Sequence, residues 1–429
     1  MRDVGRGLRV RGRAAQLRQS RLRLRSTLAK TRVMAATCTL SAEAASFVAG
    51  GGCDIDLAKT TVDSKLPPGS EVALVDKDGE TLGLGLLDTP NGLVRVMLRE
   101  AEGFSKIDGA FIGWRVQRAY ALRRALGLAE DSTTSLAAYR LLHGAGDGLP
   151  GFTCDALGRF GVVYVYSEAL WKHGKQVAEA CAGFGKLDGI VVKLRARGGA
   201  NDVKQEVVGK APPERYIAEE LGVPFEIHPM GGLNTGLFTD MREQRRGLPR
   251  FVGGRRVLNL FSYTGALSLA CARAGAATVT SVDTSDGVQQ WAAGNFVRSG
   301  FAANDKRWQF EVGDAVRYLA RAAREREQYD LVMIDPPTYS PARGTPWTLD
   351  RDYPDLIAKA CAVIPSGGLL WLAANTHELG SLLRLAQKGF RLAGRNAAVL
   401  EQGGLPPDYP TAAAQPKDRY LQIALFALA

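Results

Sequence analysis

The feature that most constrains the fold is a series of short apolar runs, each of which ends at a small polar turn or an acid. The run at residues 257–261 leads into a polar turn and then into an apolar helical pattern from Ala266. Three later runs end at Asp283, Asp314 and Asp335. Short apolar strands that alternate with helices indicate a parallel sheet covered on both faces. Because ligands bind where the carboxyl ends of such strands meet, the sequence predicts several carboxylates along one nucleotide-sized slot.

The rest of the chain divides into further segments. Its 429 residues and 46% hydrophobic content are enough for two or three domains with real cores. We expect an α/β protein with a doubly wound, Rossmann-like unit over residues 231–429 and a small central α/β domain over residues 104–230. A hairpin signal at residues 76–79 indicates a β-rich domain over residues 54–103. No apolar run approaches the roughly 20 residues that a membrane helix needs.

The basic charge lies almost entirely at the N-terminus. Residues 1–33 hold ten arginines and Lys30 against one acid, Asp3, in a chain whose net charge is +11. We expect this extension to be disordered because it has no apolar pattern that could join a core. It fits an RNA-binding arm, an Arg-rich transit peptide, or untranslated sequence before a start at Met34. The charge alone therefore does not establish nucleic-acid binding.

The six cysteines include no C-x-x-C pair, so we expect no zinc site and no other bound metal. A reducing compartment fits this usage, and the expected location is cytoplasmic.

The glycine pattern limits which nucleotide the slot could hold. A dinucleotide fold needs G-x-G-x-x-G after its first strand, but the turn here contains only Gly265. A literal match at residues 146–151 contains Pro150 and is predicted to be a loop. S-adenosylmethionine, which has no phosphates, fits better, with Asp283 accepting from the ribose hydroxyls and Asp314 from the adenine amine. The simpler alternative for each acid is a solvated residue at the end of a strand.

Two further motifs flank the slot. In the run at residues 335–339, two prolines stiffen the turn and remove two donors, so Asp335 and the Pro336 carbonyl can accept from a base amine. Tyr339 offers a stacking face. In the run at residues 234–245, Phe238 and Arg242 are predicted to lie against the cofactor, with Arg242 pairing with a carboxylate. A plain strand-exit turn and a helix cap are the respective structural alternatives.

The runs at residues 146–151, 234–242, 259–265 and 335–339, in this order, resemble the bacterial 23S ribosomal RNA methyltransferases of the PUA-linked class I family. The resemblance covers roughly residues 70–429. It implies a PUA-like RNA-binding domain, a central domain, a Rossmann-like methyltransferase domain, S-adenosylmethionine as cofactor and ribosomal RNA as partner. Together with the motifs, it gives as candidate cofactor-binding residues Phe238, Asp240, Arg242, Phe261, Ser262, Tyr263, Thr264, Gly265, Asp283, Asp314 and Asp335. The candidate catalytic residues are Asp335, Pro336, Tyr339 and Asn375.

The chain departs from the cytosine-C5 branch of that family, whose members carry a nucleophilic cysteine. C5 of cytosine is a poor nucleophile until a thiolate adds at C6, yet neither Pro337-Thr338 nor the run at residues 373–377 contains a cysteine. The sequence looks closer to the guanine-N7 branch, in which Asn375 and His377 could hold the base. We therefore expect methylation of a base nitrogen. Cytosine-C5 methylation and a non-catalytic RNA-binding protein are the alternatives, and the missing glycines disfavour a nicotinamide dehydrogenase.

Overall fold

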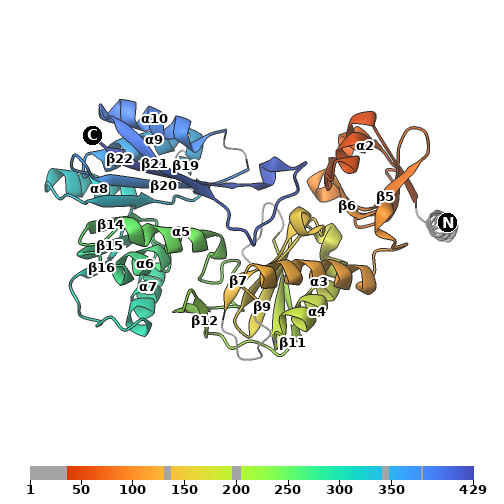
Figure 1. The fold of residues 1–429 in the computed structure, drawn as a ribbon, viewed down its shortest axis with the longest axis horizontal. Coiled ribbons are helices and arrows are strands. Elements are labelled where there is room, and N and C mark those ends of the chain that lie inside the picture. Colours follow the sequence, from red (N-terminus) through yellow and green to blue (C-terminus); the bar gives the residue numbers. More distant parts are fainter. Residues whose placement is uncertain (1–35, 130–136, 196–203, 341–346, 378–379) are drawn as a thin grey trace, which may run out of the picture.

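The computed structural model describes residues 36–129, 137–195, 204–340, 347–377 and 380–429. The basic extension at residues 1–33 lies outside the described residues, so its three interpretations stay predictions. Figure 1 shows a β-rich N-terminal part, a central α/β part and a larger C-terminal α/β part.

The C-terminal part is built on a seven-stranded sheet whose order is β16-β15-β14-β17-β20-β22-β21. The strands are β14 (Arg256–Leu260), β15 (Thr278–Asp283), β16 (Trp308–Val312), β17 (Leu331–Ile334), β20 (Leu369–Asn375), β21 (Ala397–Gly404) and β22 (Leu421–Leu428). The first five strands of the sheet order pair in parallel, whereas β22 is antiparallel to both of its neighbours. The predicted α/β doubly wound unit is confirmed.

Helices cover both faces of this sheet because its strands are apolar on both sides. The helices are α5 (Arg242–Gly247), α6 (Ala266–Arg273), α7 (Asp286–Arg298), α8 (Ala315–Arg324), α9 (Leu349–Cys361) and α10 (Leu382–Ala393). Leu269 of α6 packs with Val257 on one face, and Leu356 of α9 packs with Leu258 on the other. Figure 1 shows α5, α6 and α7 on one side of the sheet and α8, α9 and α10 on the other.

The central part holds a five-stranded sheet in the order β11-β10-β9-β8-β7, together with two helices. Its elements are α3 (Gly109–Ala125), β7 (Ala138–His143), β8 (Phe152–Leu157), β9 (Phe160–Val165), α4 (Gly174–Gly185), β10 (Gly189–Leu194) and β11 (Gln205–Gly209). The hairpin of β12 (Tyr216–Glu220) and β13 (Val223–Ile227) leads from this part to the C-terminal part.

The N-terminal part is a six-stranded sheet in the order β2-β6-β5-β4-β1-β3, with one helix. Its elements are β1 (Ala36–Leu40), α2 (Ala42–Ala49), β2 (Asp54–Asp56), β3 (Thr60–Thr61), β4 (Glu71–Val75), β5 (Thr81–Asp88) and β6 (Leu93–Arg99). Because β1 pairs in parallel with β4, this sheet begins well before residue 54, where we expected the β-rich domain to start. The parts also share core, since Leu84 of β5 packs in one cluster with Phe111 of α3.

One segment ties the three parts together. We call residues 405–420, between β21 and β22, the strap. Its Asp408 accepts a hydrogen bond from the backbone N of Arg140 in the central part at 2.9 Å. Its Gln415 donates to Asp54 in the N-terminal part at 3.2 Å. In Figure 1 this dark blue segment reaches from the C-terminal sheet across to the other two parts.

The strap seats closely on the predicted loop at residues 146–151, which begins in a short 3-10 turn over Gly144–Asp147. A Cβ atom at Gly146 would lie 1.8 Å from the Pro410 carbonyl oxygen. We expect Gly146→Ala to lower the free energy of unfolding by about 1–3 kcal/mol, because backbone atoms of the strap must move. Thermal unfolding should show a lower midpoint for this variant than for Gly113→Ala, where a Cβ meets nothing within 4 Å. Equal midpoints would contradict this packing.

In the part of the chain that the structure covers, no helix is long and apolar enough to cross a membrane.

Candidate functional site

The turn after β14 has an unusual backbone. Phe261 and Tyr263 adopt left-handed φ angles of 60° and 48°, although neither is glycine, and Gly265 follows at 75°. Non-glycine residues in this region carry strain that clusters at functional sites. The turn is held by Asp283 at the end of β15, whose Oδ2 accepts from the backbone N of Tyr263 at 3.0 Å. This hydrogen bond therefore fixes the backbone conformation of the turn at the carboxyl end of the sheet.

A pocket of about 440 Å³, which we call the outer pocket, lies over this turn at the carboxyl ends of β14, β15 and β17. It brings together most of the residues that the sequence predicted. Those that line it are Phe238, Asp240, Phe261, Ser262, Tyr263, Thr264, Asp283, Asp335, Pro336 and Asn375. The strand order explains this grouping, because β15, β14, β17 and β20 are consecutive neighbours in the sheet.

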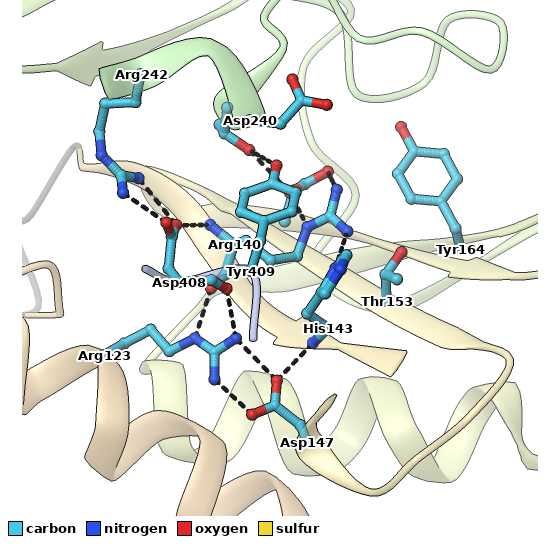
Figure 2. Close-up of polar contacts among 12 residues, drawn as sticks. Arg123, Arg140, His143, Asp147, Thr153, Tyr164, Asp240, Arg242, Asp408 and Tyr409 are labelled. Carbon is cyan, nitrogen blue, oxygen red and sulfur yellow. Dashed lines mark hydrogen bonds and ion pairs between the residues drawn. The ribbon is translucent and has the colours of Figure 1, made fainter. Parts of the chain in front are cut away.

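The structure corrects the expected role of Arg242. Its guanidinium does not line the outer pocket but forms two hydrogen bonds with Asp408 of the strap, at 2.8 and 2.5 Å. Both side chains are almost fully buried, with 2% and 0% of their surface exposed. The physical reason is that the buried Asp408 carboxylate needs a cation, and the bidentate guanidinium supplies one. Figure 2 shows this pair beside the network around Arg140.

Two other predicted residues lie next to the outer pocket without lining it, and for a third only the backbone is described. Asp314 caps α8, where its Oδ1 accepts from the backbone N of Arg317 at 2.9 Å, while its neighbours Gly313 and Ala315 line the pocket. Gly265 begins α6 as its N-cap. The backbone of Tyr339 lies in the short strand β18 (Tyr339–Ser340), and its side chain is outside the described part of the structure.

Sequence reasoning missed several residues that line the outer pocket. Arg195, at the end of the central sheet, and Asn234 both line it with exposed side chains. Arg245 also lines it, but its guanidinium is paired with Glu220 and the Phe238 carbonyl. No sequence motif marks Arg195 as a site residue, because it belongs to the central part of the chain and reaches the pocket only in the folded structure. Arg245 stood in the run at residues 234–245 and could have been found there.

Two carboxyl groups, those of Asp240 and Asp335, line the outer pocket. Burial, and then the nearby Asp240 carboxylate, raise the pKa of Asp335 to about 7. Burial also raises the pKa of Asp240, which accepts from the Tyr420 hydroxyl at 3.1 Å. The buried Tyr353 hydroxyl donates to the carbonyls of Ile334 and Ala373, so it fixes the strand ends that carry Asp335 and Asn375. Such pKa shifts are typical of functional sites.

A second pocket of about 220 Å³, the inner pocket, adjoins the first between the central sheet and the strap. It shares with the outer pocket Arg195, Asn234, Phe238, Asp240 and Asn375. Its other walls are aromatic or polar, and include His143, Tyr164, Tyr166, Tyr409 and Tyr420. His377, a candidate base contact, lines the inner pocket only. None of the residues that line either pocket is a cysteine, and every cysteine is buried elsewhere.

Within the described residues, no group of three or more histidine, cysteine, aspartate or glutamate side chains is placed to hold a metal ion.

A doubly wound sheet with a strained first turn and a carboxylate at the end of the next strand is the arrangement over which α/β proteins bind nucleoside-containing ligands. A family model described as S-adenosylmethionine-dependent methyltransferase matches residues 167–419. The chain belongs to this family, and its cofactor is S-adenosylmethionine. The outer pocket fits that cofactor, because it offers carboxylate acceptors and aromatic surface.

Curated relatives cover most of the chain. It is 29% identical over 370 residues to Ribosomal RNA large subunit methyltransferase I of Klebsiella pneumoniae (strain 342), across 84% of this chain and 90% of the relative. It is also 29% identical over 364 residues to the protein of the same name from Photobacterium profundum, across 82% and 89%.

Solved structures share the fold. A protein described as a SAM-dependent methyltransferase from Streptococcus mutans matches with a TM-score of 0.78 and 23% identity, across 90% of this chain and 98% of that one. A methyltransferase complexed with SAH matches with a TM-score of 0.79 and 22% identity, across the same shares. At these identities the likeness confirms the fold alone.

Proposed function

We propose that this enzyme methylates a base nitrogen of large-subunit ribosomal RNA, with guanine N7 as the target atom. The names of its curated relatives support the RNA class. The observation that favours a base nitrogen over cytosine C5 is that no cysteine lines the outer or the inner pocket. The choice of guanine N7 rests on the resemblance of the run at residues 335–339 and the loop of Asn375 to the guanine-N7 branch. Methylation at cytosine C5 needs a thiolate beside the base, whereas a ring nitrogen with a lone pair needs only positioning.

The charges in the site suit this chemistry. When bound, the cofactor supplies an electrophilic methyl group on a positively charged sulfonium. As the base nitrogen gains the methyl group, the positive charge moves to the base. Asp335 lines the outer pocket and Asp240 lines both pockets, so their carboxylates favour a cation on a base held there. Fixed charges in a partly dry site act strongly on a developing charge.

We propose that Asp283 holds the ribose hydroxyls of the cofactor, since it lines the outer pocket. Asp283→Ala should weaken S-adenosylmethionine binding about 10- to 150-fold, because charge-assisted hydrogen bonds contribute roughly 1.5–3 kcal/mol. Calorimetry on the folded variant checks this. Asp286→Ala is the matched control, because Asp286 pairs with Gln290 outside the pocket. Unchanged affinity in Asp283→Ala would remove Asp283 from the cofactor site.

The raised pKa of Asp335 predicts a pH dependence. An acid with a pKa of about 7 is mostly protonated at pH 6 and mostly a carboxylate at pH 8. If the carboxylate stabilises the charge on the base, kcat/KM for S-adenosylmethionine should rise from pH 6 to 8 and then level off. The midpoint of this rise should lie near pH 7, and the rise should be absent from the pH profile of Asp335→Asn. A flat wild-type profile across this range would contradict the role of the carboxylate.

We also propose the domain roles that the sequence suggested, with the N-terminal sheet as a PUA-like RNA-binding domain, residues 104–230 as the central domain, and residues 231–429 as the methyltransferase domain. The β-rich architecture of residues 36–99 supports the first assignment. Crosslinking of the full chain to ribosomal RNA should give adducts in the N-terminal sheet as well as at the two pockets. Adducts confined to the other two parts would contradict it.

Methyl transfer itself is tested with labelled S-adenosylmethionine and large-subunit RNA from a strain that lacks this enzyme. We expect saturable incorporation that approaches one methyl group per RNA. Absence of incorporation, with cofactor binding intact, would favour the non-catalytic RNA-binding alternative.

A further inference from the structure

The inner pocket contains a histidine whose tautomer the structure fixes. His143 ends β7 and is 9% exposed, and its Nδ1 lies 3.0 Å from Nη1 of Arg140. A guanidinium can only donate hydrogen bonds, so Nδ1 is the acceptor and the ring proton sits on Nε2. Burial, and then the charges of Arg140 and Arg123, lower the pKa of His143 well below its usual range. His143 is therefore a neutral imidazole with an Nε2–H donor at pH 7.

This donor is available to a ligand. The His143 ring lines the inner pocket. Among the groups that the structure describes, none accepts a hydrogen bond from its Nε2. The atom is also not among the fully buried polar atoms without a partner, so it keeps access to the pocket. An Nε2–H placed there can serve an acceptor on a bound molecule.

The orientation of the ring is set by a buried network, which Figure 2 shows around Arg140. Nε of Arg140 donates to Asp155 at 2.7 Å, and its guanidinium lies 4.3 Å from the centroid of the Tyr409 ring. The backbone N of His143 donates to Asp147 at 2.6 Å. Because every member is held by a partner, the donor has a fixed position before any ligand arrives.

The shape and walls of the inner pocket suit a nucleobase. The 41% exposed Phe238 and the half-buried rings of Tyr166 and Tyr420 offer aromatic surface on which a base can stack. Asn234 and Asn375 line both pockets and carry a donor and an acceptor each. A base seated in the inner pocket would thus present its reactive edge to the outer pocket, where the cofactor binds.

We propose that the inner pocket receives the target base, extruded from the RNA, and that His143 donates from Nε2 to a ring carbonyl oxygen of that base. This inference rests on the proposed function and adds a residue that selects the base. Guanine offers O6 as the acceptor. Adenine places an amine there, so two donors would face each other in a buried site. Discrimination through one such contact is typically about 10- to 100-fold.

The test uses RNA segments that carry, at the mapped target position, guanosine, inosine or 2,6-diaminopurine riboside. Inosine keeps the O6 carbonyl and lacks only the 2-amine, whereas diaminopurine keeps N7 and the 2-amine but replaces O6 by an amine. The wild-type enzyme should methylate the inosine RNA within a few-fold of the guanosine RNA. Its kcat/KM for the diaminopurine RNA should be about 10- to 100-fold lower. Equal values for guanosine and diaminopurine would overturn the proposal.

The variant His143→Phe tests whether the His143 ring causes the discrimination between guanosine RNA and diaminopurine RNA. It should lower kcat/KM on guanosine RNA about 10- to 100-fold, leave S-adenosylmethionine affinity unchanged and reduce the diaminopurine discrimination to a few-fold. The matched control is His173→Phe, which changes an equally buried histidine outside both pockets and should keep the wild-type pattern. Undiminished discrimination in a folded His143→Phe enzyme would overturn the role of His143. Failure of the proposed function would look different, because the wild-type enzyme would then not methylate guanosine RNA at all.

Discussion

Replacing Asp335 by alanine should lower kcat by about 100-fold or more, which corresponds to roughly 2.7 kcal/mol of transition-state stabilisation. Asp335 follows β17 and lines the outer pocket, where burial and then the nearby Asp240 raise its pKa. Under the proposed function, the Asp335 carboxylate accepts from the base and favours the positive charge that the base acquires. Single-turnover methyl transfer with saturating cofactor isolates this step from binding. Asp355→Ala is the control, because Asp355 is exposed on α9 and pairs only with Lys359 among the described residues.

Asp335→Asn separates the two contributions. The amide keeps an oxygen acceptor but loses the charge, so its rate should lie between those of the wild type and the alanine variant. If Asp335→Ala transferred methyl groups at the wild-type rate while binding S-adenosylmethionine normally, the turn at residues 335–339 would be structural only.

Replacing Arg242 by alanine should lower the free energy of unfolding by about 3–5 kcal/mol, because it leaves the buried Asp408 carboxylate without its partner. The strap would then lose one of its buried contacts with the C-terminal part. The affinity of the folded variant for S-adenosylmethionine should change little, since Arg242 does not line the outer pocket. Denaturant unfolding and calorimetry measure the two effects.

Arg246→Ala is the matched control for Arg242→Ala. Arg246 lies on the same helix, is 55% exposed and pairs with Glu243 at the surface, so its loss should cost less than about 1 kcal/mol. A large loss of cofactor affinity in Arg242→Ala with stability unchanged would restore the original expectation that this residue binds the cofactor carboxylate.

Local patterns predicted the strands of the C-terminal sheet closely. The runs that end at Asp283 and Asp335 form β15 and β17, and β17 is buried and apolar throughout, as expected for a strand covered on both faces. Helix α10 begins at Leu382, whose backbone N donates to Gln422 on β22. That contact spans 40 residues and leaves no local pattern.

The candidate site also has one part that local sequence patterns predicted and another part that they did not. The outer pocket is built mostly by strand ends, so the order of motifs along the chain predicted it. The actual contacts of Arg242 and Asp314 could not be predicted from the sequence. An arginine can pair with a buried carboxylate instead of a ligand, and an aspartate can cap a helix instead of binding a ligand. The inner pocket was missed because β7, β9 and the strap form it together, and Arg140 and Asp408 meet across 268 residues.

Identification of the methylated nucleoside tests the central proposal most directly. Large-subunit RNA from a strain that lacks this enzyme would be treated with the purified protein and S-adenosylmethionine, digested and examined by nucleoside mass spectrometry. The proposed function predicts 7-methylguanosine as the new product. The absence of a thiol from both pockets predicts that no covalent adduct forms on RNA that carries 5-fluorocytidine. Appearance of 5-methylcytidine, or a trapped enzyme–RNA adduct, would contradict the nitrogen target and establish cytosine-C5 chemistry instead.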